Sequence, residues 1–286
     1  MVFNSVGLFG RYQDSGVEET ISHLQALLKK RGINVFLGDP TANEISGPRI
    51  EDSDKPLPDT IDVGIVVGGD GTMLHVARIL ADYGLPLIGI NLGRLGFLTD
   101  IAADDVEERL DQILSGDFVT EERSMLSAKV NRNTELLADC TALNDIFLSK
   151  GATGKLIECE TRIGGQMVSR TRSDGIIIAT PTGSTAYALS AGGPILHPAL
   201  SALIFAPICP HSLGQRPLVL DDKSEIEIRI VNLAGAPANF FVDGLLSLSL
   251  NGDETIRVKR SKKITRLVHT KSHNHYSTLS AKLGWG

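Results

Sequence analysis

The sequence DVGIVV at residues 62–67, followed directly by the turn GGDG at residues 68–71, constrains the fold of this chain more than any other segment. An apolar run of strand length without polar alternation is typical of a strand that is buried on both faces. A helical pattern follows at residues 72–84, and a second apolar run, PLIGIN, follows at residues 86–91. Because strands alternate here with a helix, the segment predicts parallel βαβ units with right-handed crossovers.

The same alternation extends over the first third of the chain. Its other expected elements are a strand at residues 6–9, a helix with Val17, Ile21, Leu24 and Leu28 on one face after the capping residues Asp14 and Ser15, a strand at residues 33–37 and an amphipathic helix at residues 104–114. Residues 39–60 are rich in Pro, Asp, Ser and Gly without periodicity, which predicts a long loop. We therefore expect an α/β N-terminal domain with a Rossmann-like parallel sheet.

After about Glu122 the pattern changes to the strict alternation of half-buried strands. Alternating strands are expected at residues 157–163 and 226–230, and further strands at residues 240–242 and 247–260. A hairpin turn is expected at Gly164-Gly165 and one helix at residues 185–191. This half of the chain should be a mainly antiparallel, β-rich C-terminal domain. The tail at residues 269–286 is too short to fold alone and should pack onto another part of the chain.

The composition excludes several classes of protein. A formal net charge of −6 argues against a general nucleic-acid binder, which usually carries a basic surface. The three cysteines are far apart and form no C-x-x-C pair, so we expect neither a disulfide framework nor a structural zinc site. No stretch approaches the roughly 18 apolar residues of a membrane span, and the N-terminal residues lack a secretory-signal pattern. We expect a cytoplasmic protein with no nucleic-acid or membrane partner.

The turn GGDG lies where phosphate groups often bind. Glycines let the backbone approach a ligand closely, and the N-terminus of the following helix favours an anion. Like charges repel, so the Asp70 carboxylate suggests either magnesium coordination or removal of a proton from an attacking hydroxyl. On this turn alone, a cap of a helix that starts at Thr72 is an equally good interpretation. The turn is neither a Walker A loop nor a G-x-G-x-x-G fingerprint.

The sequence NLGRLGFLTD at residues 91–100 also follows a strand, so it should share the carboxyl edge of the parallel sheet with GGDG. Its Phe97 either stacks on a base or nicotinamide ring or covers the sheet edge. Its Arg94 is either a ligand contact or a surface residue.

The segment at residues 173–194, SDGIIIATPTGSTAYALSAGGP, runs from a buried strand into small polar residues. It offers the ring of Tyr187 and the hydroxyl groups of Thr180, Thr182, Ser184, Thr185 and Ser190. This surface suits hydrogen bonding to ribose, amide and phosphate groups. The alternative, a strand-to-helix connection with a serine cap, would use one hydroxyl but not five.

Two further groups of polar residues are less informative. Asn144-Asp145 adds an amide and a carboxylate after a strand-like stretch, but alone it is a turn signal. His269, His273 and His275 suggest a metal site. We prefer a solvated tail, because this cluster brings no carboxylate or cysteine partner at a typical site spacing.

Together these segments resemble the NAD kinase family over nearly the whole chain. The resemblance rests on GGDGTMLHVAR, NLGRLGFLTD, ALNDIFLSKG, RSDGIIIATPTGSTAYALSAGGPI and PHSLGQRPLVL, which follow one another in the family's order and spacing. The terminal TLSAKLGWG looks like the proteobacterial branch. GGDG alone is shared with lipid and phosphofructokinase-like kinases, whereas the TPTGSTAYxLSAGGP pattern is far more specific.

The resemblance implies a fold and an assembly. An α/β domain at residues 1–123 would be rejoined by the tail at residues 268–286. A β-rich NAD-binding domain would span residues 124–267, with NAD and ATP meeting between the two. The family also implies a homodimer or a homotetramer.

The resemblance also implies roles for individual residues. Asp70 matches the proton acceptor, Asn144 the residue that holds the adenosine ribose, and Asp174 the residue near the nicotinamide amide. Gly68, Gly69 and Gly71 match the phosphate turn. The other NAD contacts that the resemblance suggests are Gly71, His75, Phe97, Asp145, Lys155, Arg172, Thr182, Thr185, Ala186, Tyr187, Ala188, Leu189, Ser190 and Asp243.

Two positions depart from the family pattern. Asp145 stands where relatives often have Glu, so its carboxylate is one methylene shorter. Leu245 stands where many relatives place a polar residue, which argues against a ligand contact there.

The implied activity is transfer of the γ-phosphate of ATP to the adenosine-ribose 2′-hydroxyl of NAD, which gives NADP. Asp70 would be the general base, and Mg²⁺ or another divalent cation would neutralise the ATP phosphates. No protein ligand of that metal is assigned. Two alternatives remain open: a lipid or sugar kinase that shares GGDG, and a non-catalytic NAD-binding sensor. No apolar entry or basic membrane-facing patch supports a lipid kinase, and Asp70 argues weakly against a sensor.

Overall fold

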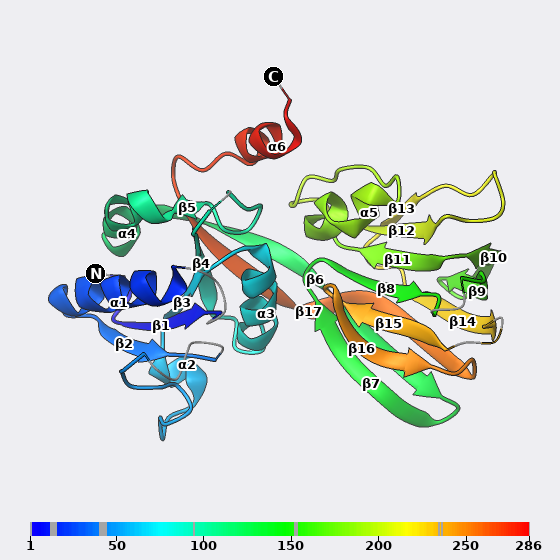
Figure 1. Cartoon of the computed structure of the whole chain (residues 1–286), viewed down its shortest axis with the longest axis horizontal. Helices are drawn as coiled ribbons and strands as arrows, with labels where there is room; N and C mark the ends of the chain where they lie inside the picture. The colour runs from blue at the N-terminus through cyan, green and yellow to red at the C-terminus, as the bar shows by residue number, and fades with distance from the viewer. Residues whose placement is uncertain are drawn as a thin grey trace. The chain divides into compact units, whose positions relative to one another are not determined.

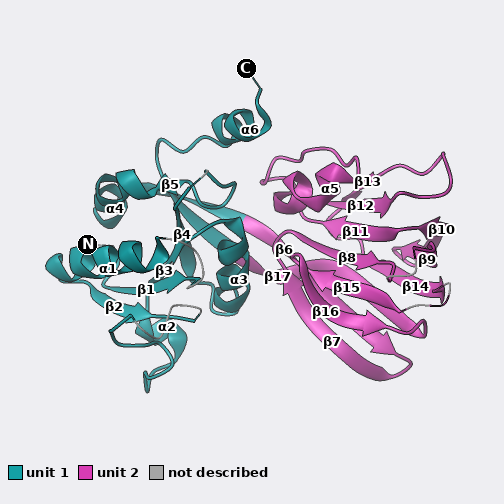
Figure 2. Ribbon diagram, viewed as in Figure 1, with its two compact units in different colours: residues 1–122, 265–286 teal, residues 123–264 magenta. Residues whose placement is uncertain are grey.

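The computed structural model divides into two compact units, which Figure 2 shows in different colours. One unit comprises residues 1–122 and 265–286, and the other comprises residues 123–264. The residues that the structure describes are 2–11, 16–39, 45–93, 95–151, 154–233, 235 and 237–285. None of the described helices is long and apolar enough to cross a membrane.

The first unit is built on a parallel sheet with the strand order β4-β3-β1-β2 (Figure 1). These strands are β1 (Ser5–Gly10), β2 (Asn34–Leu37), β3 (Val63–Val67) and β4 (Pro86–Asn91). Two further segments, β5 (Ile101–Ala102) and residues 266–267, pair in parallel with β4. Every residue of β3 is buried, as the apolar run predicted, and the expected α/β fold with a parallel sheet is confirmed.

Helices cover both faces of this sheet. Helices α1 (Val17–Lys30) and α4 (Val106–Leu114) belong to one buried cluster with alternate residues of β1, β3 and β4. Helix α3 (Asp70–Leu80) packs on the other face, where a Cβ added at Gly64 would meet its Leu80 side chain at 2.7 Å. The spacing of the apolar residues therefore determines which side of each helix meets the sheet.

Three expectations for the first unit need correction or limits. The segment at residues 39–60 is not wholly a loop, because it contains helix α2 (Leu57–Thr60) and a bridge between Leu37 and Arg49. The helix expected at residues 104–114 begins instead at Val106, because a 3-10 turn, η1 (Ala103–Asp105), precedes α4. The expected capping residues Asp14 and Ser15 lie outside the described residues.

The second unit consists mainly of antiparallel strands in two layers. One sheet has the order β13-β12-β11-β8-β15-β16, and in the other β10, β9 and β14 precede residues 255–258 of β17. The strands are β6 (Phe118–Arg132), β7 (Glu135–Ala142), β8 (Asp145–Ser149), β9 (Ile157–Ile163), β10 (Gln166–Ser173), β11 (Gly175–Ala179), β12 (Ala202–Ile208), β13 (Leu218–Asp221), β14 (Ile226–Asn232), β15 (Ala238–Val242), β16 (Leu245–Leu250) and β17 (Glu254–Thr270). Strands β6 and β17 continue from one unit into the other. The mainly antiparallel, β-rich C-terminal part is confirmed.

The period-2 patterns of the sequence form the core between these layers. Ile157 and Cys159 of β9 share one buried cluster with Ile176 and Ile178 of β11 and with Phe240 of β15. The hairpin turn between β9 and β10 has both glycines at positive φ, 57° and 79°, as a two-residue type I′ turn requires.

The helix expected at residues 185–191 is much shorter. The turn η2 (Thr182–Thr185) leads into the four-residue helix α5 (Tyr187–Ser190), whose Ala188 is buried against β11 and β12. Ala186 between them has ψ −132°, which breaks a continuous helix.

The C-terminal tail packs within the first unit. Strand β17 continues to Thr270, and helix α6 (His275–Leu283) follows, capped by the side chain of Asn274. His269 is 1% exposed, so a solvated tail is the wrong interpretation for this residue.

Candidate functional site

The turn at residues 68–71 connects β3 to α3 as the glycines predicted. Gly68 has φ 148°, a conformation that favours glycine. A Cβ added at Gly69 or Gly71 would meet nothing within 4 Å, so neither residue is glycine because of packing. The open space above these two residues fits a ligand that approaches the backbone at a helix N-terminus.

Asp70 is the first residue of α3 and not its cap. The helix has Gly69 at the N-cap and no side-chain cap hydrogen bond, so the alternative of Asp70 as the cap of a helix starting at Thr72 is wrong. The Asp70 carboxylate instead accepts hydrogen bonds from the backbone N–H groups of Phe97 at 2.9 Å and Leu98 at 3.0 Å. The two polar segments expected at one sheet edge therefore meet at this carboxylate.

The turn at residues 95–99 is built around Asp70. Gly96 donates its N–H to the carbonyl of Thr99, and the hydroxyl of Thr99 lies 3.4 Å from Oδ1 of Asp70. A Cβ at Gly96 would lie 2.1 Å from that oxygen. Only glycine leaves room for the carboxylate. Arg94, a candidate contact in this segment, lies outside the described residues.

In the second unit, Asp243 holds the segment that carries Asn144. Its carboxylate accepts the backbone N–H groups of Leu143 at 3.0 Å, Asn144 at 2.8 Å and Asp145 at 3.2 Å. Asp243 itself has φ 47°, in the left-handed region. The structure thus places this expected NAD contact as the residue that orients the backbone at residues 143–145.

The hydroxyl-rich segment packs directly on Asn144. The carbonyl of Asn144 accepts the N–H of Thr180 at 2.9 Å, and a Cβ at Gly183 would lie 2.1 Å from that carbonyl oxygen. The side chain of Asn144 is half-buried and makes no hydrogen bond to the described residues. Its amide is therefore available to a ligand.

Most hydroxyl groups of this segment bond within the unit. Thr180, Ser184 and Thr185 donate theirs to backbone carbonyls, and Thr182 accepts a hydrogen bond from the buried Arg123 at 3.3 Å. Thr180 and Ser184 are fully buried. The expectation that all five hydroxyls face a ligand is wrong for these two, because the tight turn needs them to satisfy its own backbone.

Asp145 is a buried carboxyl group, 3% exposed. Burial raises its pKa, the negative charge of Asp243 raises it further, and the backbone N–H of Tyr187 opposes both, which leaves the pKa at about 7. The shorter side chain at this family position thus lies inside the unit, where near neutral pH it is a proton donor as well as an acceptor.

The raised pKa of Asp145 predicts a pH-dependent stability. Between about pH 4 and pH 7 the unfolded chain has released a proton that the folded protein keeps, so the free energy of unfolding falls as pH rises through this window. Replacing Asp145 by Asn mimics the protonated form. We expect this variant to be more stable than the parent at pH 8, by a few kcal/mol at roughly 1.4 kcal/mol per pKa unit, and nearly equal to it at pH 4.

Urea unfolding followed by circular dichroism at pH 4 and pH 8 measures this difference. Asp253→Asn removes an exposed carboxylate of the same unit and should change stability little at either pH. A stability gain of Asp145→Asn that is equal at both pH values would contradict the buried, protonated carboxyl group.

Asp174 forms an ion pair with Lys150 at 2.6 Å, and the backbone N–H of Lys150 donates to the carbonyl of Asp174. Sequence reasoning missed Lys150. The pairing of β8 with β11 joins Ser149 to Gly175 and so brings the two residues together. Arg172 and Lys155, two expected contacts, are both exposed in the second unit.

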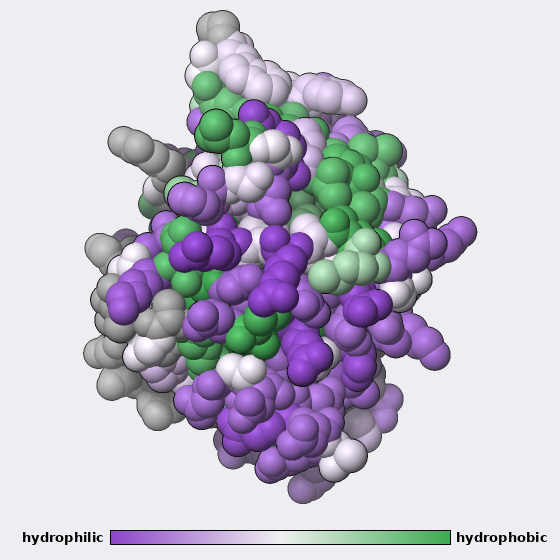
Figure 3. Space-filling model, turned by 90° about the vertical axis from the view of Figure 1, so that its right-hand side faces the viewer, coloured by the Kyte–Doolittle hydropathy of each residue, from purple (hydrophilic) through white to green (hydrophobic). Residues whose placement is uncertain are grey.

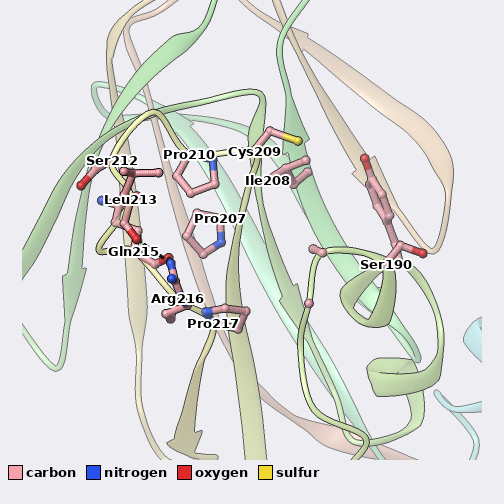
Figure 4. Close-up of a pocket in the computed structure, with 13 residues that line it drawn as sticks. Ser190, Pro207, Ile208, Cys209, Pro210, Ser212, Leu213, Gln215, Arg216 and Pro217 are labelled. Carbon is pink, nitrogen blue, oxygen red and sulfur yellow. Dashed lines mark hydrogen bonds between the residues drawn. The ribbon is translucent and has the colours of Figure 1, made fainter.

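A pocket of about 760 Å³ opens beside α5. Tyr187 and Ser190 line it together with Ser212, Gln215 and Arg216, which belong to the motif PHSLGQRPLVL (Figure 4). Figure 4 shows Ser190 on one side of the opening and the other three on the opposite side. The structure therefore brings two segments of the resemblance together around one cavity.

The remaining expected contacts differ in their surroundings. His75 is half-buried on α3, where burial and the charge of Arg78 lower its pKa. Phe97 is half-buried, with the ammonium of Lys282 5.8 Å from its ring centroid. Ala186 and Leu189 are half-buried, whereas Ala188 is fully buried and contributes packing.

The expectation that the tail histidines have no carboxylate or cysteine partner, which argued against a metal site there, is wrong. Asp100 supplies the carboxylate partner, because it accepts hydrogen bonds from Nδ1 of both His269 and His273. Burial alone would raise the pKa of Asp100, but these two hydrogen bonds hold it well below its usual range. For His269, burial opposes the charged form, yet the hydrogen bond to Asp100 and the nearby carboxylate of Glu121, 3.5 Å from Nε2, raise its pKa.

Comparisons with known proteins agree over both units. The family model of the ATP-NAD kinase N-terminal domain matches residues 6–118, and that of the ATP-NAD kinase C-terminal domain matches residues 143–270. The NAD kinase of Thiobacillus denitrificans is 42% identical over 99% of this chain and 98% of its own length. The NAD kinase of Azoarcus sp. is 43% identical over 99% and 96%, respectively.

Solved structures show the same likeness. Yeast NADH kinase complexed with NADH has a TM-score of 0.88 at 27% identity and covers 99% of this chain and 88% of its own. An NAD kinase from Archaeoglobus fulgidus in complex with ATP has a TM-score of 0.77 at 28% identity and covers 98% of both chains. With matches to both family domains and 42% identity over nearly its full length, this chain is an enzyme that belongs to the NAD kinase family.

Proposed function

We propose that this protein transfers the γ-phosphate of ATP to the adenosine-ribose 2′-hydroxyl of NAD, with Asp70 as the general base. The observation that carries the proposal is the Asp70 carboxylate, fixed by two backbone N–H groups beside an open glycine turn. A carboxylate oxygen can accept the proton of an attacking hydroxyl. Fixing it in place favours proton removal from a correctly placed hydroxyl.

The glycine turn is the proposed phosphate-binding element. Gly68, Gly69 and Gly71 leave the first turn of α3 open to an anion, and its backbone N–H groups and helix dipole favour negative charge. A divalent cation such as Mg²⁺, bound to ATP, would neutralise phosphate charge during transfer. Its ligands would be mainly phosphate oxygens and water, and we assign it no protein ligand.

The second unit supplies the residues that we propose to hold NAD. Asn144 offers its side-chain amide to the adenosine ribose, and Asp174 accepts from the nicotinamide amide. Asp243 acts through the backbone that it orients. Two further proposed contacts, His75 and Phe97, belong to the first unit. The others in the second unit are Asp145, Lys155, Arg172, Thr182, Thr185, Ala186, Tyr187, Leu189 and Ser190, with Ala188 as packing behind them. We further propose that the domains comprise residues 1–123 with 268–286 and residues 124–267.

The ion pair with Lys150 should orient Asp174 for NAD. We expect Lys150→Met to raise KM for NAD roughly 10-fold, the scale of a hydrogen bond to a charged group, with kcat changed less than about two-fold. Steady-state kinetics with NAD varied at saturating ATP measures both constants.

Lys129→Met is the matched control, because Lys129 forms an exposed ion pair with Asp139 at 3.3 Å in the same unit. It should leave both constants near the parent values. Equal effects of the two substitutions on KM would argue against a role of Asp174 in NAD binding.

We also propose that the protein is a homo-oligomer, a dimer or a tetramer. Large apolar side chains are exposed in the second unit, among them Leu213 at 90%, Val219 at 51% and Leu246 at 58%. Figure 3 shows green hydrophobic areas that interrupt an otherwise largely hydrophilic surface. Light scattering after size exclusion would give the mass of the assembly, and a monomer at micromolar concentration would contradict this proposal.

A cytoplasmic location is proposed as well. None of the three cysteines, all of which the structure describes, forms a disulfide, and Cys209 is exposed, which suits a reducing compartment. Cell fractionation with an antibody against the chain tests the location.

Formation of NADP from NAD and ATP, measured with an NADP-specific dehydrogenase, separates the proposal from its alternatives. A lipid or sugar kinase would consume ATP without forming NADP. A non-catalytic sensor would bind NAD without consuming ATP. NADP formation that depends on both substrates is the expected result.

A further inference from the structure

Three side chains of the first unit meet at a point that the proposed phosphoryl transfer does not use. Asp100 ends the segment that surrounds Asp70, His269 lies on β17, and His273 lies between β17 and α6. Oδ2 of Asp100 is 2.8 Å from Nδ1 of His269 and 2.7 Å from Nδ1 of His273. One ligand atom from each residue lies within 4.8 Å of the other two.

We propose that Asp100, His269 and His273 bind one divalent transition-metal ion, Zn²⁺ in the first instance. Two imidazole nitrogens and a carboxylate oxygen form a common protein ligand set for this ion, and they leave one coordination position for water. The three side chains are only 12%, 1% and 13% exposed, respectively. These low exposures leave little water to compete for the ligand atoms.

The two imidazoles direct the same kind of ring nitrogen at one point. Both Nδ1 atoms face the same oxygen of Asp100, so without metal each ring must carry a hydrogen there to donate. The two rings also lie face to face, with centroids 3.9 Å apart and planes 16° apart. A divalent ion bound at both Nδ1 atoms would take the place of these hydrogens, and each neutral ring would then carry its hydrogen on Nε2.

The other oxygen of the Asp100 carboxylate lacks a hydrogen-bond partner within the part of the chain that the structure describes. Oδ1 of Asp100 is buried without a hydrogen bond to any described residue, which is unusual for a carboxylate oxygen. A metal ion next to the carboxylate would offer this oxygen a positive charge. With ligand bonds of about 2.0–2.1 Å, ligand atoms on a tetrahedral ion stand roughly 3.3 Å apart. The side chains therefore need to separate by about half an ångström to admit it.

Glu121 lies where many metal sites place a supporting carboxylate. Its Oε2 is 3.5 Å from Nε2 of His269, the nitrogen on the far side of the ring. Metal at Nδ1 puts the ring hydrogen on Nε2, towards Glu121, and such a partner fixes the orientation and basicity of a ligand histidine. Glu121 is thus a positioning residue for the site.

The proposed ion would connect three segments of the first unit. It joins the end of the segment around Asp70, the last part of β17 and the residues before α6. Metal bound only by the folded chain stabilises it. We therefore expect the ion to stabilise the folded chain, with Zn²⁺ raising the melting temperature by several degrees.

Untagged full-length protein, stripped with a chelator, tests the proposal. Calorimetric titration with Zn²⁺ should show one ion per chain, and Co²⁺ should give a visible absorption band. His273→Gln should weaken Zn²⁺ binding about 100-fold or more, and Glu121→Gln about 10-fold, the lower end for supporting partners. His275→Gln, a histidine of the same tail outside the cluster, should bind Zn²⁺ like the parent.

Two results would overturn the proposal: no Zn²⁺ bound at one equivalent, or binding unchanged by both His273→Gln and Asp100→Asn. Circular dichroism shows whether each variant folds. If Asp100→Asn does not fold, His273→Gln decides, because its side chain lies in a turn. Binding and melting temperature are measured without NAD or ATP, so failure of the proposed kinase function leaves this test unaffected.

Discussion

Replacing Asp70 by Asn is expected to lower turnover about 10²-fold or more, the usual contribution of a general base. The amide cannot accept the proton of the ribose hydroxyl. The backbone N–H groups of Phe97 and Leu98 each donate to a different oxygen of the Asp70 carboxylate. An asparagine side chain has one oxygen, so it can accept only one of these two hydrogen bonds in the same way. NAD binding should remain largely intact. Turnover under saturating substrates and the dissociation constant for NAD, measured by calorimetry, give the two quantities.

The chain offers a matched control in Asp62→Asn. The Asp62 carboxylate also accepts two backbone N–H groups in the same unit, from Asn4 at 2.6 Å and Ser5 at 2.9 Å. This variant should lose roughly 1–2 kcal/mol of stability, the scale of hydrogen bonds to a charged group, with turnover within about two-fold of the parent. If Asp70→Asn keeps its turnover, or loses no more than the control, Asp70 is not the base.

The second large effect is expected from Gly96→Ala. The added methyl group would lie 2.1 Å from Oδ1 of Asp70 and 2.4 Å from the hydroxyl of Thr99, so the carboxylate must move. A displacement of about 1 Å of a catalytic group can lower turnover 10²-fold. We expect a fall of that size, with a stability loss of about 1–3 kcal/mol from overpacking.

Gly93→Ala tests whether any alanine in this segment has the same effect. A Cβ at Gly93 would meet nothing within 4 Å, and its φ is not in the left-handed region. This variant should keep turnover within about three-fold and stability within about 1 kcal/mol, the scale of Gly-to-Ala changes. Equal losses of turnover in Gly93→Ala and Gly96→Ala would contradict the prediction, because displacement of the Asp70 carboxylate would then not be the cause of the loss.

Much of the fold could be predicted because hydrophobic periodicity is a local property. The buried run of β3 and the alternation of β9 and β14 each specify an element and the face that it buries. The α5 region was harder, because Thr180 and Ser184 look like ligand groups in sequence but bond their own turn. Whether a hydroxyl faces a ligand or a carbonyl depends on backbone geometry that no spacing rule encodes.

By itself, the sequence determined the α/β and β-rich parts, the strand that leads into GGDG and the family to which the chain belongs. Only the tertiary structure decided that Asp70 is not a helix cap but a carboxylate held by two backbone N–H groups. It also decided the ion pair of Lys150 with Asp174 and the contacts of Asp100 with His269 and His273. The physical reason is distance along the chain. Asp100 and His269 are 169 residues apart, and their meeting follows from packing, which local periodicity does not describe.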